Sequence, residues 1–425
     1  MAPPHAPARP GAAGVAAPEP STPTTRRGTT PGVLVLMLAL LLGIQPVTTD
    51  LYLPALPALT SGFGARIAHA QLTLTALLLA FGASQLVLGP LSDRFGRRPV
   101  LLAGLSAYVL AAAGTALAPS IEGLIALRAL QGAAMGAAVM AARAIVRDLY
   151  QPAQGARVMS RALTGLGVIA CLCAPVGSVV TDGLGWRFAL AVPALFGVAT
   201  LALVALRFRE SLPRPDANAL RPSAIVRTWG TVLRHPTFLA FSALTTAAYG
   251  LLFTFLASSS FVFLQVLGLS RTGYGLVMLW NSLAYIAGTF LCRHWLARHG
   301  VRGSVARGAV LSLAGGTLMG ALALAGVQTV WAIAAPLTLV MLGHGVHQPC
   351  GQTGAVGPFP QAAGAASALN GFIMMLAAFA IGGWLGTHMD GSTRPLALGI
   401  WFWSGCIALL AWTVVPRFGG DRHAR

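Results

Sequence analysis

The sequence predicts an all-α membrane protein with twelve transmembrane helices arranged as two six-helix bundles. The first observation is composition: 56% of the 425 residues are hydrophobic and 9% are charged, whereas soluble domains carry about 25% charged residues. The second is a series of twelve apolar stretches of the length, about 20 residues, that crosses a hydrocarbon core of about 30 Å. The third is a strongly one-sided distribution of arginine between the loops.

The predicted spans fall into two sets of six, separated by a stretch with three prolines and mixed charge. They cover residues 32–53, 70–91, 99–118, 121–145, 158–180, 187–207, 236–257, 273–294, 305–325, 329–350, 364–387 and 394–415. The predicted organisation is therefore a tail over 1–31, an N-terminal bundle over 32–207, a linker over 208–235, a C-terminal bundle over 236–416 and a tail over 417–425. The first 30 residues, rich in Pro, Ala and Thr, are expected to be disordered.

The net charge of +18 and the pI near 11.5 could indicate a nucleic-acid-binding protein, but the placement of the charge argues against that class. The chain contains no lysine, and with an even number of spans 23 of its 28 arginines fall on the side of the termini and four on the opposite side. By the positive-inside rule this asymmetry predicts that both termini are cytoplasmic.

The loop after the second predicted span reads GPLSDRFGRRPV, from Gly89 to Val100. Gly89 and Gly96 are expected to permit unusual backbone angles, and Asp93 can accept hydrogen bonds from a helix N-terminus. Three arginines would anchor the cytoplasmic face: Arg94, Arg97 and Arg98. A simple basic turn would satisfy the same pattern. The loop nevertheless resembles the signature loop of the major facilitator superfamily, and the resemblance implies that Asp93 and Arg97 form a latch between the two halves in the outward-facing state.

Two charged residues are predicted to lie well inside spans. Asp50 follows Leu34 by sixteen residues, or roughly 24 Å of helix, and Arg128 in the fourth span is expected roughly 10 Å from the opposite face. A buried charge at such depth is costly and usually faces a cavity or a partner. We therefore expect Asp50 to face a central cavity and to be coupled to Arg128 directly, or through water and Gln131.

The motifs around these residues, TTDLYLPALP and RALQG, resemble those of proton-coupled drug exporters of the bicyclomycin and chloramphenicol resistance type. The resemblance implies that Asp50 and Arg128 serve proton coupling and substrate recognition, with Tyr52 and Gln131 beside them. Two structural alternatives stay open. Asp50 could be a helix-end carboxylate in the outer loop, and Arg128 could pair with Glu122 at the start of its helix.

The fifth span contains Pro175 and Gly177, a combination that allows a kink and close helix packing. This stretch resembles the antiporter motif of exporter families. It departs from that motif at Ala174, where a glycine often precedes the proline, so it does not establish the direction of transport.

Several residues of the second half could line a drug cavity, although packing alone would also explain them. His344 and His347 lie one helical turn apart and could titrate, bind substrate or simply pack. The other candidates are Tyr249, Phe253 and Asn281. The five cysteines lack the spacing of a metal site, and no metal or other cofactor is predicted.

The resulting hypothesis is a monomeric exporter of a small amphipathic compound in the bacterial inner membrane, driven by protons. No nucleotide-binding loop of the G-x-x-x-x-G-K-[ST] type is present in the sequence, which argues against an ATP-driven pump. Two alternatives remain: a transporter of an ordinary metabolite such as a sugar or amino acid, and a membrane enzyme or non-transporting sensor. An enzyme is not favoured, because the sequence has no His/Asp/Glu cluster at a membrane face.

Overall fold

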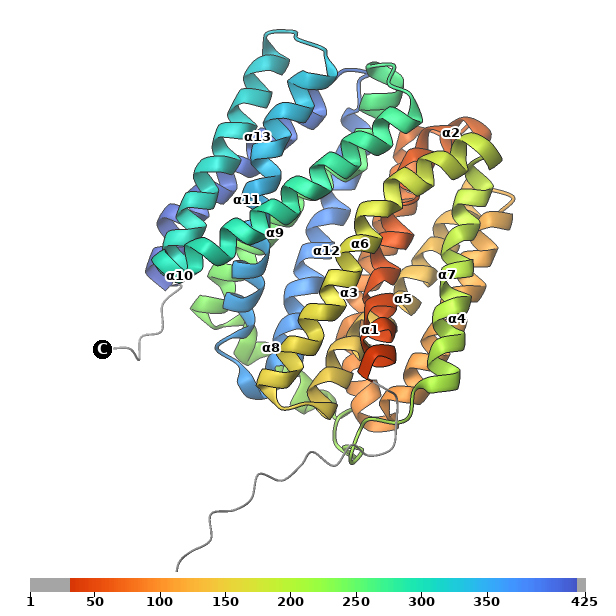
Figure 1. Cartoon of the computed structure of the whole chain (residues 1–425), viewed down its shortest axis with the longest axis vertical. Coiled ribbons are helices and arrows are strands. Elements are labelled where there is room, and N and C mark those ends of the chain that lie inside the picture. The colour runs from red at the N-terminus through yellow and green to blue at the C-terminus, as the bar shows by residue number, and fades with distance from the viewer. Residues whose placement is uncertain (1–30, 419–425) are drawn as a thin grey trace, which may run out of the picture.

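The computed structural model describes residues 31–418, and the predicted tails outside this range are not described. The described residues form helices joined by short loops (Figure 1). The N-terminal bundle contains α1 (Pro31–Thr49), η1 (Leu53–Ala55), α2 (Leu56–Gly62), α3 (Ile67–Phe95), α4 (Arg97–Leu117), α5 (Ile121–Leu149), α6 (Pro152–Leu184) and α7 (Trp186–Arg207).

The C-terminal bundle begins at Pro236, after a linker that carries a helix the sequence did not predict, α8 (Pro222–Leu233). The bundle contains α9 (Pro236–Phe261), η2 (Val262–Val266), α10 (Arg271–Leu324), α11 (Val330–Val356), η3 (Pro360–Ala362), α12 (Ala363–His388), α13 (Arg394–Leu409), η4 (Leu410–Val414) and α14 (Val415–Phe418).

Eleven of the described helical stretches are long and apolar enough to cross a membrane, and one of them holds two spans. Helix α10 has 54 residues, but Gly300 inside it has φ 63° and ψ −173°. These angles lie outside the helical region, so they interrupt the helix and the chain reverses. Glycine adopts them readily because it has no Cβ atom. Residues 271–299 and 301–324 therefore form separate spans, in agreement with the twelve predicted.

The first span differs from its predicted extent. It was expected to end at residue 53, but the apolar helical stretch continues through η1 and α2 to Gly62. This boundary was wrong because the prolines at 54 and 57 resembled the start of a loop. They instead bend the chain within the span.

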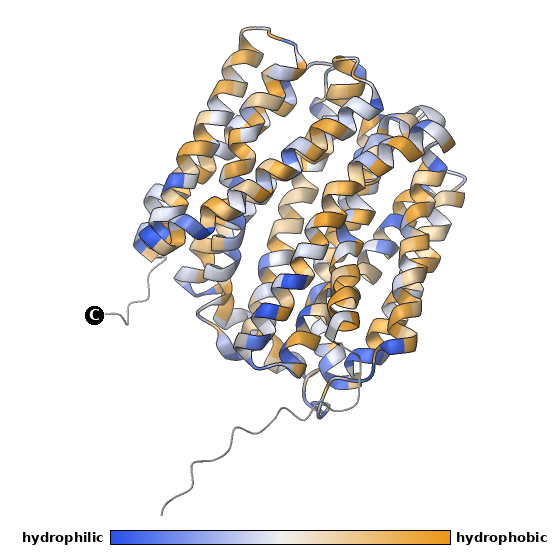
Figure 2. Cartoon of the chain, viewed as in Figure 1, coloured by the Kyte–Doolittle hydropathy of each residue, from blue (hydrophilic) through white to orange (hydrophobic). Residues whose placement is uncertain are grey.

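Hydrophobic residues cover most of the length of the helices, and many hydrophilic residues lie near the lower end in Figure 2. We call the end where α1 begins and α14 ends the terminal end, and the other the opposite end. Large apolar side chains such as Leu110, Leu195 and Trp331 are at least 70% exposed. Such an apolar surface is the one that lipid tails require.

The two bundles contact each other mainly through α3 with α12 and through α6 with α10. At the opposite end, Arg271 Nη1 lies 2.6 Å from Asp182 Oδ1, and Gln71 Nε2 donates to the Ala257 carbonyl oxygen at 2.5 Å. At the terminal end, Arg143 Nη1 donates to Ser367 Oγ at 3.0 Å. The sites described next therefore lie within a closely associated pair of bundles.

Candidate functional site

The first span is unwound near its middle, and this stretch carries Asp50. Helix α1 ends at Thr49, and residues 50–52 form turns before η1. Pro54 and Pro57 have no N–H group, so neither can make the helical hydrogen bond to the carbonyl four residues earlier. The Asp50 carbonyl oxygen accepts instead from the Leu53 N–H at 3.3 Å. Because the span continues to Gly62, Asp50 lies about 18 Å of helix from that end.

Asp50 lines a cavity of about 110 Å³ between the two bundles. The other lining residues are Gln45, Pro46, Thr49 and Leu53 from the first span, Leu74 and Leu78 from α3, and Tyr249, Leu252, Phe253 and Leu256 from α9. The rings of Tyr249 and Phe253 are stacked, with centroids 6.4 Å apart. Thr49 Oγ1 donates to Asp50 Oδ1 at 2.8 Å. One carboxylate therefore faces a mostly apolar, partly aromatic space.

Arg128 on α5 is completely buried and contacts residues on both sides of Asp50. Its Nη1 donates to the Thr48 carbonyl oxygen at 3.2 Å and to Gln131 Oε1 at 3.1 Å. Its guanidinium carbon lies 4.0 Å from the centroid of the Tyr52 ring. Tyr52 is itself fixed by a 2.5 Å hydrogen bond between its hydroxyl and Thr73 Oγ1. The Arg128 Nε and Nη2 atoms are buried without a hydrogen-bond partner.

The structure joins Arg128, Gln131 and Tyr52, but it does not join them to Asp50. Among the residues described, Asp50 has no ion pair within 4.0 Å, and Arg128 reaches the backbone of Thr48, two positions before Asp50. Glu122 likewise forms no ion pair with Arg128 in the described part of the chain. Arg128 therefore contacts the backbone that carries Asp50 and not the Asp50 carboxylate itself.

Replacement of Arg128 by lysine is expected to reduce transport at least tenfold although the positive charge is kept. An ammonium group cannot bond Thr48 and Gln131 from one planar head while stacking on Tyr52. The loss of charge-assisted hydrogen bonds corresponds to about 1.5–3 kcal/mol. Initial transport rates in proteoliposomes measure the effect, and Arg94→Lys at an exposed position serves as the control. Full activity of Arg128→Lys would show that charge alone suffices.

Pro175 and Gly177 lie where α6 contacts both the unwound stretch of the first span and α10 of the other bundle. A Cβ atom added to Gly177 would overlap the Leu51 carbonyl oxygen of the unwound stretch. A Cβ atom added to Gly275 on α10 would lie 3.1 Å from the Pro175 Cα atom. The glycine at 177 therefore lets α6 approach the backbone next to Asp50, while Pro175 contacts the other bundle.

His344, His347 and Asn281 are buried within the C-terminal bundle and are absent from the described lining of the Asp50 cavity. Asn281 Nδ2 donates to the Val277 carbonyl oxygen at 2.9 Å. The His344 ring lies 5.5 Å from that of Tyr285, and His347 packs where Gly308 of α10 leaves space. Both ring nitrogens of His347 are buried without a hydrogen-bond partner. No group of three potential metal ligands occurs among the described residues.

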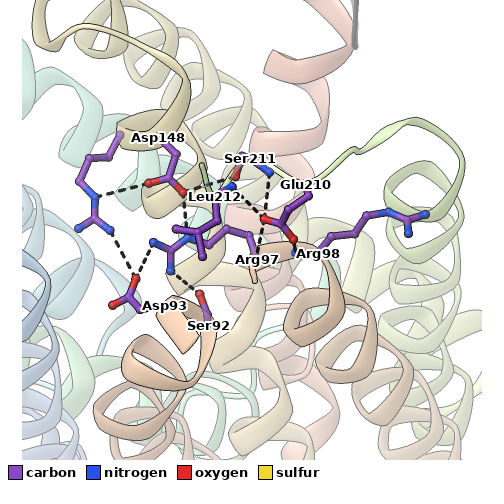
Figure 3. Close-up of polar contacts among 9 residues, drawn as sticks. Ser92, Asp93, Arg97, Arg98, Asp148, Glu210, Ser211 and Leu212 are labelled. Atoms are coloured by element: carbon purple, nitrogen blue, oxygen red, sulfur yellow. Dashed lines mark hydrogen bonds and ion pairs between the residues drawn. The ribbon is translucent and has the colours of Figure 1, made fainter. Parts of the chain in front are cut away.

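The loop between α3 and α4 forms a second polar site at the terminal end (Figure 3). Arg97 is 2% exposed and binds two carboxylates: Nη2 lies 2.6 Å from Asp93 Oδ1, and Nε lies 2.9 Å from Asp148 Oδ2 at the end of α5. Arg98 Nε donates to the Phe208 carbonyl oxygen at 2.8 Å, whereas Arg94 is exposed. Among the described residues these contacts join α3, α4, α5 and the linker, so the cluster braces the N-terminal bundle.

The two glycines of this loop behave differently. Gly96 has φ 99°, and a Cβ atom there would lie 2.7 Å from Glu210 Oε2. Gly89 lies inside α3 and is not among the described glycines with positive φ. The expectation of an unusual backbone angle at Gly89 was therefore wrong, because the turn begins seven residues later.

Glu210 from the linker caps the N-terminus of α4. Its carboxylate accepts hydrogen bonds from the backbone N–H groups of Arg97 and Arg98 at 2.9 and 3.0 Å, and from those of Ser211 and Leu212 at 3.0 and 2.9 Å. Partial burial opposes ionisation of the group, but these four donors outweigh it and lower the pKa of Glu210 below its ordinary value. The capping contact thus depends on the ionised form.

Replacement of Glu210 by glutamine is expected to weaken the attachment of the linker to α4. Because Glu210 is largely exposed, the expected loss is about 1 kcal/mol, or roughly fivefold faster exchange of the local amides. The lowered pKa means that the contribution is present above an unfolded value of about 4.3 and is lost as the pH falls through the folded pKa. Hydrogen exchange of Arg97, Arg98, Ser211 and Leu212 should therefore differ between wild type and variant at pH 7 and converge only as the pH falls below the lowered pKa of folded Glu210. Asp216→Asn in the same linker should leave these amides unchanged.

Among the site residues that sequence analysis missed are Thr48, Tyr108, Asp148 and Glu210. Thr48 and Tyr108 share a 2.6 Å hydrogen bond behind the unwound stretch, and Asp148 and Glu210 complete the terminal-end cluster. Thr48 lies within the recognised motif TTDLYLPALP, so the sequence did carry a signal for it. The other three lie far along the chain from their partners, and only the fold brings them together.

The fold and these sites define the chain as a two-bundle membrane transporter, and comparison with known proteins gives its family. The model of the major facilitator superfamily matches residues 38–383. The chain belongs to this superfamily. Its fold resembles that of the xylose transporter XylE of Escherichia coli in a partially occluded inward-open conformation, with a TM-score of 0.71, 14% identity, and coverage of 93% of this chain and 99% of that one.

Curated relatives confirm the resemblance to the bicyclomycin and chloramphenicol resistance group. A chloramphenicol resistance protein of Pseudomonas aeruginosa is 31% identical over 75% of each chain. Multidrug resistance protein D of Escherichia coli is 30% identical over 80% of this chain and 84% of that protein. The uncharacterized MFS-type transporter YdgK of Bacillus subtilis is 31% identical, and the match spans 61% of this chain and 65% of that protein, just under two thirds. These similarities support a multi-pass protein of the bacterial inner membrane.

Proposed function

We propose that the protein exports small amphipathic drugs from the bacterial cytoplasm in exchange for protons, as a monomer with both termini in the cytoplasm. The observation that carries the proposal is the position of Asp50, a carboxylate in an unwound part of a span that faces an aromatic cavity between the bundles. Among the described residues, every other carboxylate lies at a helix end or in a loop. The names of the relatives, two of which refer to drug resistance, support drugs as the substrates.

In the proposed cycle a proton and a drug compete for the same cavity. A carboxylate in an apolar space is costly when ionised and unpaired, so an empty cavity favours the protonated acid. A drug that donates a hydrogen bond to Asp50, or brings a positive charge to it, favours the ionised form and displaces the proton. Exchange then follows from the fact that the acid cannot satisfy both ligands at once.

The remaining residues support this exchange by positioning the acid. Arg128, Gln131 and Tyr52 fix the backbone beside Asp50, and Tyr249 and Phe253 supply flat apolar surfaces for a drug ring. The ion pair between Asp182 and Arg271 and the contact of Gln71 with Ala257 hold the bundles together at the opposite end. We assign this arrangement to a state closed towards the outside. In the other, outward-facing state, the terminal-end cluster around Arg97 acts as a latch.

The function is tested by transport in proteoliposomes that contain the purified full-length chain. An imposed proton gradient is expected to drive chloramphenicol across the membrane against its own gradient, and dissipation of the proton gradient by an ionophore should stop the movement. A transporter of an ordinary sugar or amino acid would instead leave chloramphenicol unmoved and move the metabolite under the same gradient. The aromatic, mostly apolar cavity favours the drug.

A further inference from the structure

The turn between the two spans of α10 carries an unusual concentration of positive charge. Between residues 293 and 307 it holds four arginines and two histidines, all exposed: Arg293, His294, Arg298, His299, Arg302 and Arg307. In the corresponding loop of the first bundle, Arg97 is neutralised by Asp93 and Asp148. The described C-terminal bundle has a single carboxylate, Asp390, which follows α12 at the opposite end of the molecule.

This positive charge has no counter-charge among the residues that the structure describes. Among the described residues, none of the four arginines forms an ion pair within 4.0 Å. Arg307 Nη1 donates to the Gly303 carbonyl oxygen at 3.1 Å, and the guanidinium carbon of Arg293 lies 4.3 Å from the ring centroid of the exposed Phe290. Guanidinium groups at this density bind phosphate oxygens well.

An apolar groove lies on the exposed face of α13. Its volume is about 390 Å³, and it is lined by Trp401, Phe402, Gly405, Cys406 and Leu409. A Cβ atom added to Gly405 would meet nothing within 4 Å, so the groove is open at that point. Phe402 and Leu409 are 62% and 61% exposed, as expected of side chains that contact lipid tails.

Trp412 joins the groove to the basic turn. It follows Leu409 by three residues, or roughly 4.5 Å of helix, and its indole Nε1 donates to the Ala306 carbonyl oxygen at 3.2 Å. Tryptophan is typical of the level of the lipid headgroups. The groove, Trp412 and the arginines therefore follow one another along the molecule in the same order as the parts of a phospholipid. The groove corresponds to an acyl chain, Trp412 to the headgroup level and the arginines to the phosphate.

We propose that this surface is a specific binding site for an anionic phospholipid of the leaflet at the terminal end. The phosphate contacts Arg298, Arg302 and Arg307, and one acyl chain lies in the groove on α13. The site is independent of the Asp50 cavity, and the lipid neutralises a turn that no described carboxylate neutralises.

Native mass spectrometry of the full-length protein in detergent tests the proposal, with phosphatidylglycerol and phosphatidylcholine of identical acyl chains as probes. Wild type is expected to retain phosphatidylglycerol in preference to phosphatidylcholine. The combined change Arg298→Gln, Arg302→Gln and Arg307→Gln should reduce the affinity for phosphatidylglycerol at least tenfold, since one arginine near a phosphate is worth roughly fivefold. The matched control Arg214→Gln, Arg221→Gln and Arg227→Gln removes the same charge from exposed linker positions and should retain the lipid.

A second pair of variants tests the groove without changing charge. Gly405→Phe fills the open space on α13 and should weaken phosphatidylglycerol binding, whereas Gly383→Phe, at an equally open position on α12, should not. Equal loss in the linker control, or equal retention of phosphatidylcholine, would overturn the proposal in favour of a diffuse charge effect. Displacement of the lipid by millimolar inorganic phosphate would show a free-anion site instead.

Discussion

Replacement of Asp50 by asparagine is expected to abolish proton release on drug binding and to reduce proton-driven transport at least 100-fold. Asparagine keeps the size of the side chain and can still accept from Thr49 Oγ1, the contact made at 2.8 Å by the native acid. It cannot gain or lose a proton in the working pH range. Because the other described carboxylates lie outside the cavity, no described acid is placed to substitute for it.

The measurement is the release of protons from purified, reconstituted protein on addition of chloramphenicol, followed with a pH-sensitive dye in weak buffer. Glu122→Gln removes a carboxylate from an exposed position in the first turn of α5 and should release as many protons as wild type. If Asp50→Asn still released protons, the coupling acid would lie elsewhere. If drug bound to wild type without any release, the antiport proposal would fail.

Replacement of Gly177 by valine is expected to have a large structural effect next to the site. The new side chain would overlap the Leu51 carbonyl oxygen, and a backbone atom cannot be displaced as cheaply as a flexible side chain. Overpacking of this kind costs about 1–3 kcal/mol or more. The unwound stretch would have to move away from α6 and carry Asp50 with it.

Gly183→Val is the matched control, because Gly183 lies on the same helix and a Cβ atom there would meet nothing within 4 Å. Thermal unfolding in detergent and drug binding by equilibrium dialysis should both be impaired for Gly177→Val and close to wild type for Gly183→Val. Equal impairment of the two variants would indicate that α6 requires glycine at both positions for another reason, and the close approach to Leu51 would not be the cause.

The spans were predictable from the sequence because lipid imposes a long apolar run on each of them. The details that failed were those decided by backbone geometry. Pro54 and Pro57 suggested the end of the first span, whereas the structure uses them to unwind its middle. The linker helix α8 was missed because it is short and lies in a stretch with three prolines and mixed charge, a pattern equally typical of a loop.

The site was predictable where a residue is rare for its surroundings, and not where it is ordinary. An acid and an arginine deep in apolar spans stand out, so Asp50 and Arg128 could be singled out, but their lack of a direct ion pair in the described structure could not. Helix α9 is apolar on all sides and is buried along most of its length. Such a helix has no periodic pattern to indicate which face lines a cavity.

The placement of Asp50 and Arg128 on one bundle has an electrical consequence under the proposed cycle. When Asp50 is ionised the two groups sum to zero charge, and when it is protonated they sum to plus one. No described carboxylate lies in a span of the C-terminal bundle, so that bundle adds no acid to this balance. A membrane potential that is negative inside therefore acts on the proton-loaded N-terminal bundle and favours its inward step, by up to about 2.3 kcal/mol per 100 mV for a full crossing. The return step with a neutral drug carries no net charge, so the voltage drives only one half of the exchange.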